Sequence, residues 1–149
     1  MDRTMSKHLV KGSIASEFVS ELISKHQTKD NLGAHAIFLG QVRADKLDED
    51  SVIAIEYSAY EEMAEKEIHS LKEHYLQEYD LHCLHIYHST GIVKTGELSL
   101  VVMVSAAHRQ DTFDLLKDIV EQIKLKVPIW KKEMLSDGSE RWIKEKQLD

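Results

Sequence analysis

Residues 81–105 read LHCLHIYHSTGIVKTGELSLVVMVS, and this stretch indicates the fold class most directly. Its two ends, Leu81–His88 and Glu97–Ser105, are apolar and rich in residues that favour strands, and Gly91 and Gly96 lie between them. Runs of this kind joined through glycines are typical of hairpins. The stretch therefore predicts two strands that are neighbours in one sheet.

The residues before this stretch predict a helix followed by two strands. Ile14–Ser24 has apolar residues at every fourth position, which is helical spacing. Gly33–Val42 is apolar and strand-like, and Val52–Tyr57 is rich in β-branched residues. Between them, Arg43–Asp50 is predicted to be a polar, acidic loop.

Two further helices are predicted from apolar residues that share one helical face. The first face consists of Tyr60, Ala64, Ile68, Leu71 and Tyr75. The second consists of Phe113, Leu116, Val120 and Ile123, and that helix ends at Val127 because a residue before proline disfavours helical backbone. Strand-like pieces follow around Ile129–Trp130 and Trp142–Ile143.

The resulting order is α-β-β-α-β-β-α-β-β. Hairpin-like neighbours outnumber βαβ crossovers, which favours an α+β fold with a mixed or antiparallel sheet and about three helices. The chain is predicted to form a single domain over residues 1–149, because it has 149 residues and its sequence contains neither a recognisable repeat nor a linker.

The amino-acid composition argues against several classes of function. The net charge of −7 and the lack of a long basic stripe argue against nucleic-acid binding. The start of the chain has no apolar secretory region, and no run approaches the roughly 18 apolar residues of a membrane helix. The expected setting is the cytoplasm, with no membrane contact.

Metal and nucleotide sites are not predicted. His82 and His88 would share one face of a strand and His85 the other, so the three would not converge. The lone Cys83 is expected to be a small buried apolar residue, and there is no HExxH, P-loop or GxGxxG pattern. We therefore expect no metal and no resident cofactor.

Five cationic side chains are candidates for holding an anion: Arg43, His108, Arg109, Lys124 and Lys131. His108 and Arg109 lie at a helix start, where free N–H groups favour anions, although they also fit a surface pair beside a helix cap. Arg43 follows Gly40, and a glycine in a strand often marks a close approach by a backbone or a ligand. Its alternative role is an ion pair with the acidic loop.

Lys124 and Lys131 bracket a Pro-Ile-Trp segment. Lys124 borders the apolar helix face, where partial desolvation would lower its pKa. It also fits a lysine stabilised by the helix C-terminal dipole, and Lys131-Lys132 also fits a solvated basic pair. If all five cations converge, the ligand is a phosphorylated small molecule, and the reaction remains open.

Five segments together resemble the large, catalytic subunits of molybdopterin synthases. They occur in family order and are GAHAIFLGQVR (33–43), IEYSAYEEMAEKEI (55–68), GIVKTGELSLVVMVSAAHRQDTF (91–113), IKLKVPIWKKE (123–133) and SERWI (139–143). The His-Arg pair and the block that combines a lysine with PIWKKE are specific in combination.

The resemblance implies an α/β-hammerhead-like fold and a sulfurtransferase of molybdenum cofactor biosynthesis. It implies a homodimer that carries a ubiquitin-like small subunit at each end, as a heterotetramer. The small subunit supplies sulfur as a C-terminal thiocarboxylate to cyclic pyranopterin monophosphate, which gives the dithiolene of molybdopterin. The alternative to an enzyme is a non-enzymatic module that binds a ubiquitin-like Gly-Gly tail.

The resemblance also assigns residues. It implies that Lys124 and Lys131 are catalytic and also bind substrate. The substrate-binding set further comprises Gln41, Val42, Arg43, His108, Arg109, Lys132 and Glu133. One departure is Ser89, where family members often have arginine, and another is the acidic loop at residues 44–50.

Overall fold

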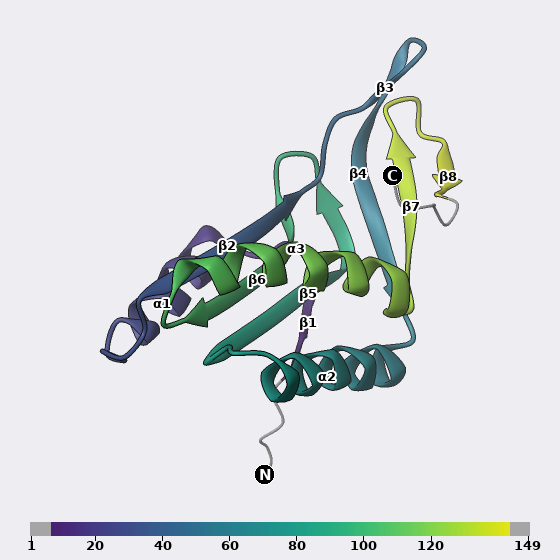
Figure 1. The fold of residues 1–149 in the computed structure, drawn as a ribbon. Helices are drawn as coiled ribbons and strands as arrows, with labels where there is room; N and C mark the ends of the chain where they lie inside the picture. The colour runs from purple at the N-terminus through teal and green to yellow at the C-terminus, as the bar shows by residue number, and fades with distance from the viewer. Residues whose placement is uncertain (1–6, 144–149) are drawn as a thin grey trace.

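The computed structural model describes residues 7–143, which form three helices and eight strands (Figure 1). In chain order these are β1 (Leu9–Lys11), α1 (Ser16–His26), β2 (Ala34–Gln41), β3 (Lys46–Leu47), β4 (Asp50–Ala59), α2 (Glu61–Glu78), β5 (Cys83–Lys94), β6 (Leu98–Ala106), α3 (Arg109–Lys126), β7 (Ile129–Leu135) and β8 (Glu140–Trp142). None of the helices in this part of the chain is long and apolar enough to cross a membrane.

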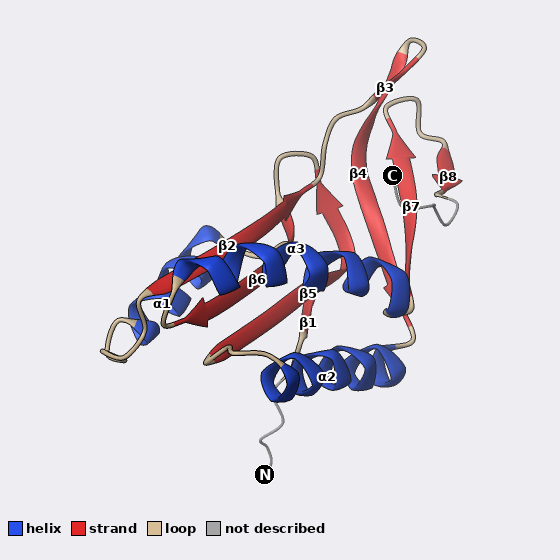
Figure 2. Cartoon of the chain, viewed as in Figure 1, coloured by secondary structure: helices blue, strands red, loops and turns tan. Residues whose placement is uncertain are grey.

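The strands form one sheet in the order β2-β6-β5-β4-β7-β8 (Figure 2). All pairings along this order are antiparallel, and the short β1 adds a parallel pairing to β5. The α+β fold with a mixed sheet and three helices is therefore confirmed.

β5 connects the two halves of the sheet. Cys83–His88 pair with β6, whereas the stretch from Gly91 to Lys94 pairs with β4. Gly91 lies at the change of partner with φ 83°, a backbone conformation that favours glycine. The predicted hairpin is confirmed, but its first strand continues to Lys94, so the turn contains only Gly96 of the two glycines.

The helices cover opposite faces of the sheet. α2 and α3 pack on one face, where Leu84, Ile86, Val102 and Val104 are buried in the main core. α1 packs on the other face, in a smaller core that includes Val101 and Met103 (Figure 1). Because successive strand residues point to opposite faces, β6 contributes to both cores and is buried along nearly its whole length.

Two predicted core residues are exposed. Tyr60 precedes the first turn of α2 as its N-cap and is 65% exposed, so the buried face of that helix begins at Ala64. Phe113 is 63% exposed, whereas Thr112 and Ile119 of α3 are buried. Successive helical residues are rotated by about 100° around the helix axis. A predicted apolar face that is wrong by one residue therefore places a side chain at the edge of the buried face.

Other boundaries also differ from the prediction. The helix expected from Ile14 begins at Ser16, and Ile14 instead forms a bridge with Leu98. The short strands β1 and β3 were not predicted, because each depends on a partner distant in sequence or on a tight hairpin. The predicted end of α3 is confirmed, since Val127 is extended before Pro128.

Candidate functional site

Lys124 and Lys131 approach the same buried residue, His88, from two different elements. Lys124 lies in the last turn of α3, Lys131 on β7 and His88 on β5. Burial lowers the pKa of His88 to about 4, and the positive charges of Lys131 and Lys124 act in the same direction. The fold thus brings both predicted catalytic lysines to one position at the end of α3.

Tyr57 completes the surface on which these groups lie. It is the cross-strand partner of Lys131, and its ring meets that of His88 edge to face at 5.2 Å between centroids. The Tyr57 hydroxyl donates a hydrogen bond to Ser99 Oγ at 3.1 Å, and burial raises the pKa of this phenol. Both aromatic groups are therefore uncharged near neutral pH, and the lysines carry the positive charge.

Sequence reasoning missed Tyr57, and it considered His88 only as a metal ligand. Nothing in the sequence distinguishes Tyr57 beyond its place in a predicted strand. The expectation for Lys124 was also wrong in one respect, because Lys124 is exposed in the single chain rather than partly desolvated. Lys131 is half-buried, as expected for a strand residue beside a tyrosine.

Lys132 and Glu133 form ion pairs within the sheet. Lys132 Nζ lies 3.1 Å from Glu140 and 3.6 Å from Glu56, so β7 is linked to both neighbouring strands. Glu133 is 7% exposed, and its Oε1 accepts a hydrogen bond from Arg141 Nε at 2.9 Å and forms an ion pair with Arg141 Nη2 at 2.8 Å. The alternative of a solvated basic pair is therefore wrong for Lys132.

Gln41, Val42 and Arg43 line an open hollow of about 520 Å³, together with Ala44, Thr95 and Gly96. Val42 joins this hollow to the lysine site, because it packs with Tyr57 and Val93 in one small core. The structure thus places the predicted Gln41–Arg43 segment beside the surface that carries Lys131.

Arg43 pairs with the acidic loop, and Gly40 marks a close approach by a neighbouring strand. Arg43 Nε donates to Asp45 Oδ1 at 2.6 Å, so the guanidinium pairs with the acidic loop and remains largely exposed. A Cβ at Gly40 would lie 3.1 Å from Leu100 Cβ. Gly40 therefore permits close contact between β2 and β6. Arg43 can bind a ligand only if its guanidinium gives up the ion pair with Asp45.

His108 and Arg109 do not join the other cations in the single chain. His108 is the N-cap of α3 and Arg109 its first residue, and both are exposed. Lys124 lies fifteen residues after Arg109 on the same helix. At about 1.5 Å per residue the two ends are separated by roughly 22 Å, so one copy of the chain does not bring His108 and Arg109 together with Lys124.

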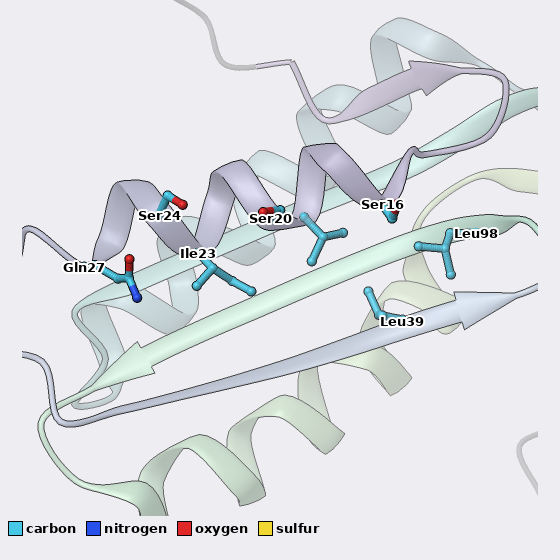
Figure 3. Close-up of a pocket in the computed structure, with 8 residues that line it drawn as sticks. Ser16, Ser20, Ile23, Ser24, Gln27, Leu39 and Leu98 are labelled. Carbon is cyan, nitrogen blue, oxygen red and sulfur yellow. The ribbon is translucent and has the colours of Figure 1, made fainter.

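A second hollow lies between α1 and the edge of the sheet. It is about 340 Å³ and is lined by residues such as Val19 and Ile23 of α1, with Leu39 and Leu98 opposite them. Figure 3 shows Ile23 directed toward the space between α1 and the strands that carry Leu39 and Leu98. It contains none of the predicted site residues.

Comparisons with known proteins agree with this architecture. The chain is 33% identical over 125 residues to a molybdopterin synthase catalytic subunit of Aspergillus fumigatus, an alignment of 84% of the chain and 66% of that protein. It is 38% identical to the subunit of that name from Thermoplasma volcanium, over 82% of the chain and 88% of the relative. The chain spans only 57% of the length of the rat relative.

Among solved structures, molybdopterin synthase from Staphylococcus aureus matches with a TM-score of 0.79 and 26% identity. That match covers 95% of this chain and 99% of the other. The model of the MoaE protein family matches residues 13–126, which include the Gln41–Arg43 hollow, the His108-Arg109 pair and Lys124. The chain therefore belongs to the MoaE protein family.

Proposed function

We propose that this chain is the catalytic subunit of a molybdopterin synthase and acts as a sulfurtransferase. The observation that carries the proposal is the approach of Lys124 and Lys131 to buried His88 from separate elements. The names of the relatives support the same activity. The proposed substrate is cyclic pyranopterin monophosphate, whose phosphate suits a cationic surface.

The sulfur source in this proposal is a partner protein. Cys83 is the only cysteine of the chain, and it is buried on the face of the sheet that α1 covers. The two lysines lie toward the opposite face, beside His88 and Tyr57. Cys83 is thus poorly placed to carry sulfur to this site, and a ubiquitin-like small subunit with a C-terminal thiocarboxylate supplies it instead.

The lysines have distinct roles in the proposed reaction. The thiocarboxylate sulfur attacks a substrate carbon that bears oxygen, and the C–O bond of that carbon breaks as the oxygen leaves. Water then attacks the acyl carbon of the resulting thioester, so that the partner leaves as a carboxylate and the sulfur stays on the substrate as a thiolate. The Lys124 ammonium stabilises the oxyanion formed in that attack, because a fixed positive charge lowers the energy of a developing negative one. Lys131 holds the phosphate or the carboxyl end of the partner.

A second copy of the chain completes the proposed site. Roughly 22 Å along α3 is more than a small pterin phosphate can span, so His108 and Arg109 of one copy cannot meet a ligand at its own Lys124. In a two-fold homodimer, His108 and Arg109 of the second copy take that place. With a small subunit at each end, the proposed assembly is a cytoplasmic heterotetramer.

A reconstituted turnover assay tests the proposal. Purified chain is mixed with thiocarboxylated small subunit and cyclic pyranopterin monophosphate, and oxidised product is read by fluorescence. We expect product from the wild type and about 10² to 10³ times slower formation of product by Lys124→Ala. A folded wild-type chain that binds the small subunit without forming product would instead support a module that only binds the Gly-Gly tail.

A further inference from the structure

A cluster of metal-ligating side chains lies on the face of the sheet opposite His88, between α1 and β5. His26 is the last residue of α1, and Cys83 and His85 are the first and third residues of β5. One nitrogen or sulfur atom from each lies within 4.8 Å of the others. His26 and His85 are 59 residues apart in sequence, so the fold rather than a local motif brings them together.

His26 is oriented as a metal ligand. Its Nδ1 lies 2.8 Å from the carbonyl oxygen of Leu22, to which it donates its proton. The other nitrogen, Nε2, then carries a lone pair and lies 2.9 Å from Nε2 of His85. Metal-ligating histidines commonly donate their second N–H to a carbonyl in this way, which fixes both tautomer and ring orientation. His26 is only 4% exposed, so its ring is held in place by packing.

Cys83 and His85 supply the other two possible ligand atoms. His85 Nε2 donates its proton to the lone pair of His26 Nε2, so an ion bound to both nitrogens requires the His85 proton to move to Nδ1. Lys29 Nζ lies 3.4 Å from Cys83 Sγ, so the sulfur faces a cationic group in the absence of an ion. Neutral imidazole and thiolate are the forms that bind metal ions. The lysine is exposed and long, so it can turn toward solvent when an ion binds.

We propose that His26 Nε2, His85 Nε2 and Cys83 Sγ form a site for a divalent ion of the zinc type. Two imidazole nitrogens and one thiolate are a donor set that zinc prefers, and three protein ligands leave one position for water. Tetrahedral zinc places two nitrogens roughly 3.3 Å apart, so the observed 2.9 Å needs to open by only a few tenths of an ångström.

His35 lies beside the cluster but outside the three residues whose ligand atoms converge. Its ring centroid lies 6.1 Å from that of His26, and its Nδ1 hydrogen-bonds with Ser105 Oγ at 2.7 Å. Both Cys83 and His35 are cross-strand partners of Ser105, which places them in one row across the sheet. A bound ion would link the end of α1 to β5 and so stabilise the folded chain. This site is separate from the lysine site and does not depend on the proposed function.

The first test replaces zinc with cobalt in the full chain, after metal has been removed with a chelator. Because Cys83 is the only cysteine, a thiolate-to-cobalt charge-transfer band reports on this residue alone. We expect that band to saturate at one cobalt ion per chain, together with the visible bands of tetrahedral cobalt. Zinc should then displace the cobalt and raise the melting temperature. Wild-type chain that shows no charge-transfer band would overturn the proposal.

Matched variants separate the site from general binding by surface histidines. Cys83→Ser should abolish the charge-transfer band, and His85→Gln should weaken zinc binding at least tenfold, measured against a chromophoric chelator. His82→Gln is the control, because His82 is exposed and adjacent to Cys83 but outside the cluster. Circular dichroism without metal checks that each variant folds. Equal zinc affinity in wild type and His85→Gln would also overturn the proposal.

Discussion

His88 and Tyr57 meet edge to face, with 5.2 Å between ring centroids, and Tyr57 is the cross-strand neighbour of Lys131. Edge-to-face aromatic pairs contribute packing energy without adding charge. The lysines of the candidate site therefore lie beside an aromatic pair that adds no charge of its own near pH 7.

The first prediction concerns Lys124. Lys124→Ala should lower turnover by about 10² to 10³, the range seen when one oxyanion-stabilising donor is removed. Because the Lys124 side chain is exposed, the melting temperature of the variant should differ little from that of the wild type. Lys126→Ala is the matched control, since Lys126 is an exposed lysine in the same helical turn. Equal losses in the two variants would show that general positive charge, rather than Lys124 itself, supports the reaction.

A different kinetic signature is expected for Lys131. If this lysine holds the phosphate or the partner's carboxyl end, Lys131→Ala should raise KM more than it lowers kcat. Lys117→Ala, an exposed lysine elsewhere on α3, provides the comparison. Steady-state kinetics at several ionic strengths would measure the effect. An unchanged KM for both substrates would remove this role from Lys131.

The pairing of Glu133 with Arg141 predicts a stability effect rather than a catalytic one. Arg141→Ala leaves the buried Glu133 carboxylate without its guanidinium partner. We expect a loss of about 1 kcal/mol in the free energy of unfolding, at the low end of the usual range because the guanidinium is half exposed.

Urea unfolding of the single variants and of Glu133→Gln/Arg141→Ala would measure the coupling between the two residues. The double variant should lose less than the sum of the single losses. Strictly additive losses would show that the pair does not interact in solution.

The pH dependence of stability should report on His88. The pKa of His88 is about 4 in the folded chain, compared with an ordinary value of 6.5. Between these values the unfolded chain binds more protons, so stability is fully present above about pH 6.5 and is lost as the pH falls toward 4. The whole shift corresponds to about 3 kcal/mol.

His88→Gln removes this titration and keeps an N–H donor in place of His88 Nδ1, which lies 2.8 Å from the Ser89 carbonyl oxygen. Denaturant unfolding between pH 7 and pH 4 should give a shallower slope for this variant than for the wild type. Other histidines titrate in both proteins, so the difference between the slopes isolates His88. Parallel curves would contradict the assignment.

The sequence predicts the elements of this fold better than their edges. Apolar runs such as Glu97–Ser105 and the spacing of Ala64, Ile68 and Leu71 depend on local periodicity, and the structure confirms them. β1 and β3 depend on pairing with distant or tightly turned strands, which local periodicity does not contain. The exposure of Phe113 depends on which side of α3 meets the sheet, and that is set by packing.

The candidate site was predictable only in part. Lys124 and Lys131 are noticeable in the sequence because they bracket a rigid segment, and the structure brings both to His88. His108 and Arg109 are far from these lysines because α3 is long. That separation becomes evident only once α3 is known to be continuous from Arg109 to Lys126. The proximity of His26 to His85 arises from the crossing of α1 over β5, and no sequence spacing encodes it.

The length of α3 has a genetic consequence. If each site takes its lysine from one copy and its His-Arg pair from the other, two defective chains can complement each other. In a dimer of Lys124→Ala and Arg109→Ala chains, one site contains both defects and the other contains neither. Random mixing of the two inactive proteins should therefore restore about a quarter of the wild-type rate, because half of the two-fold dimers are mixed.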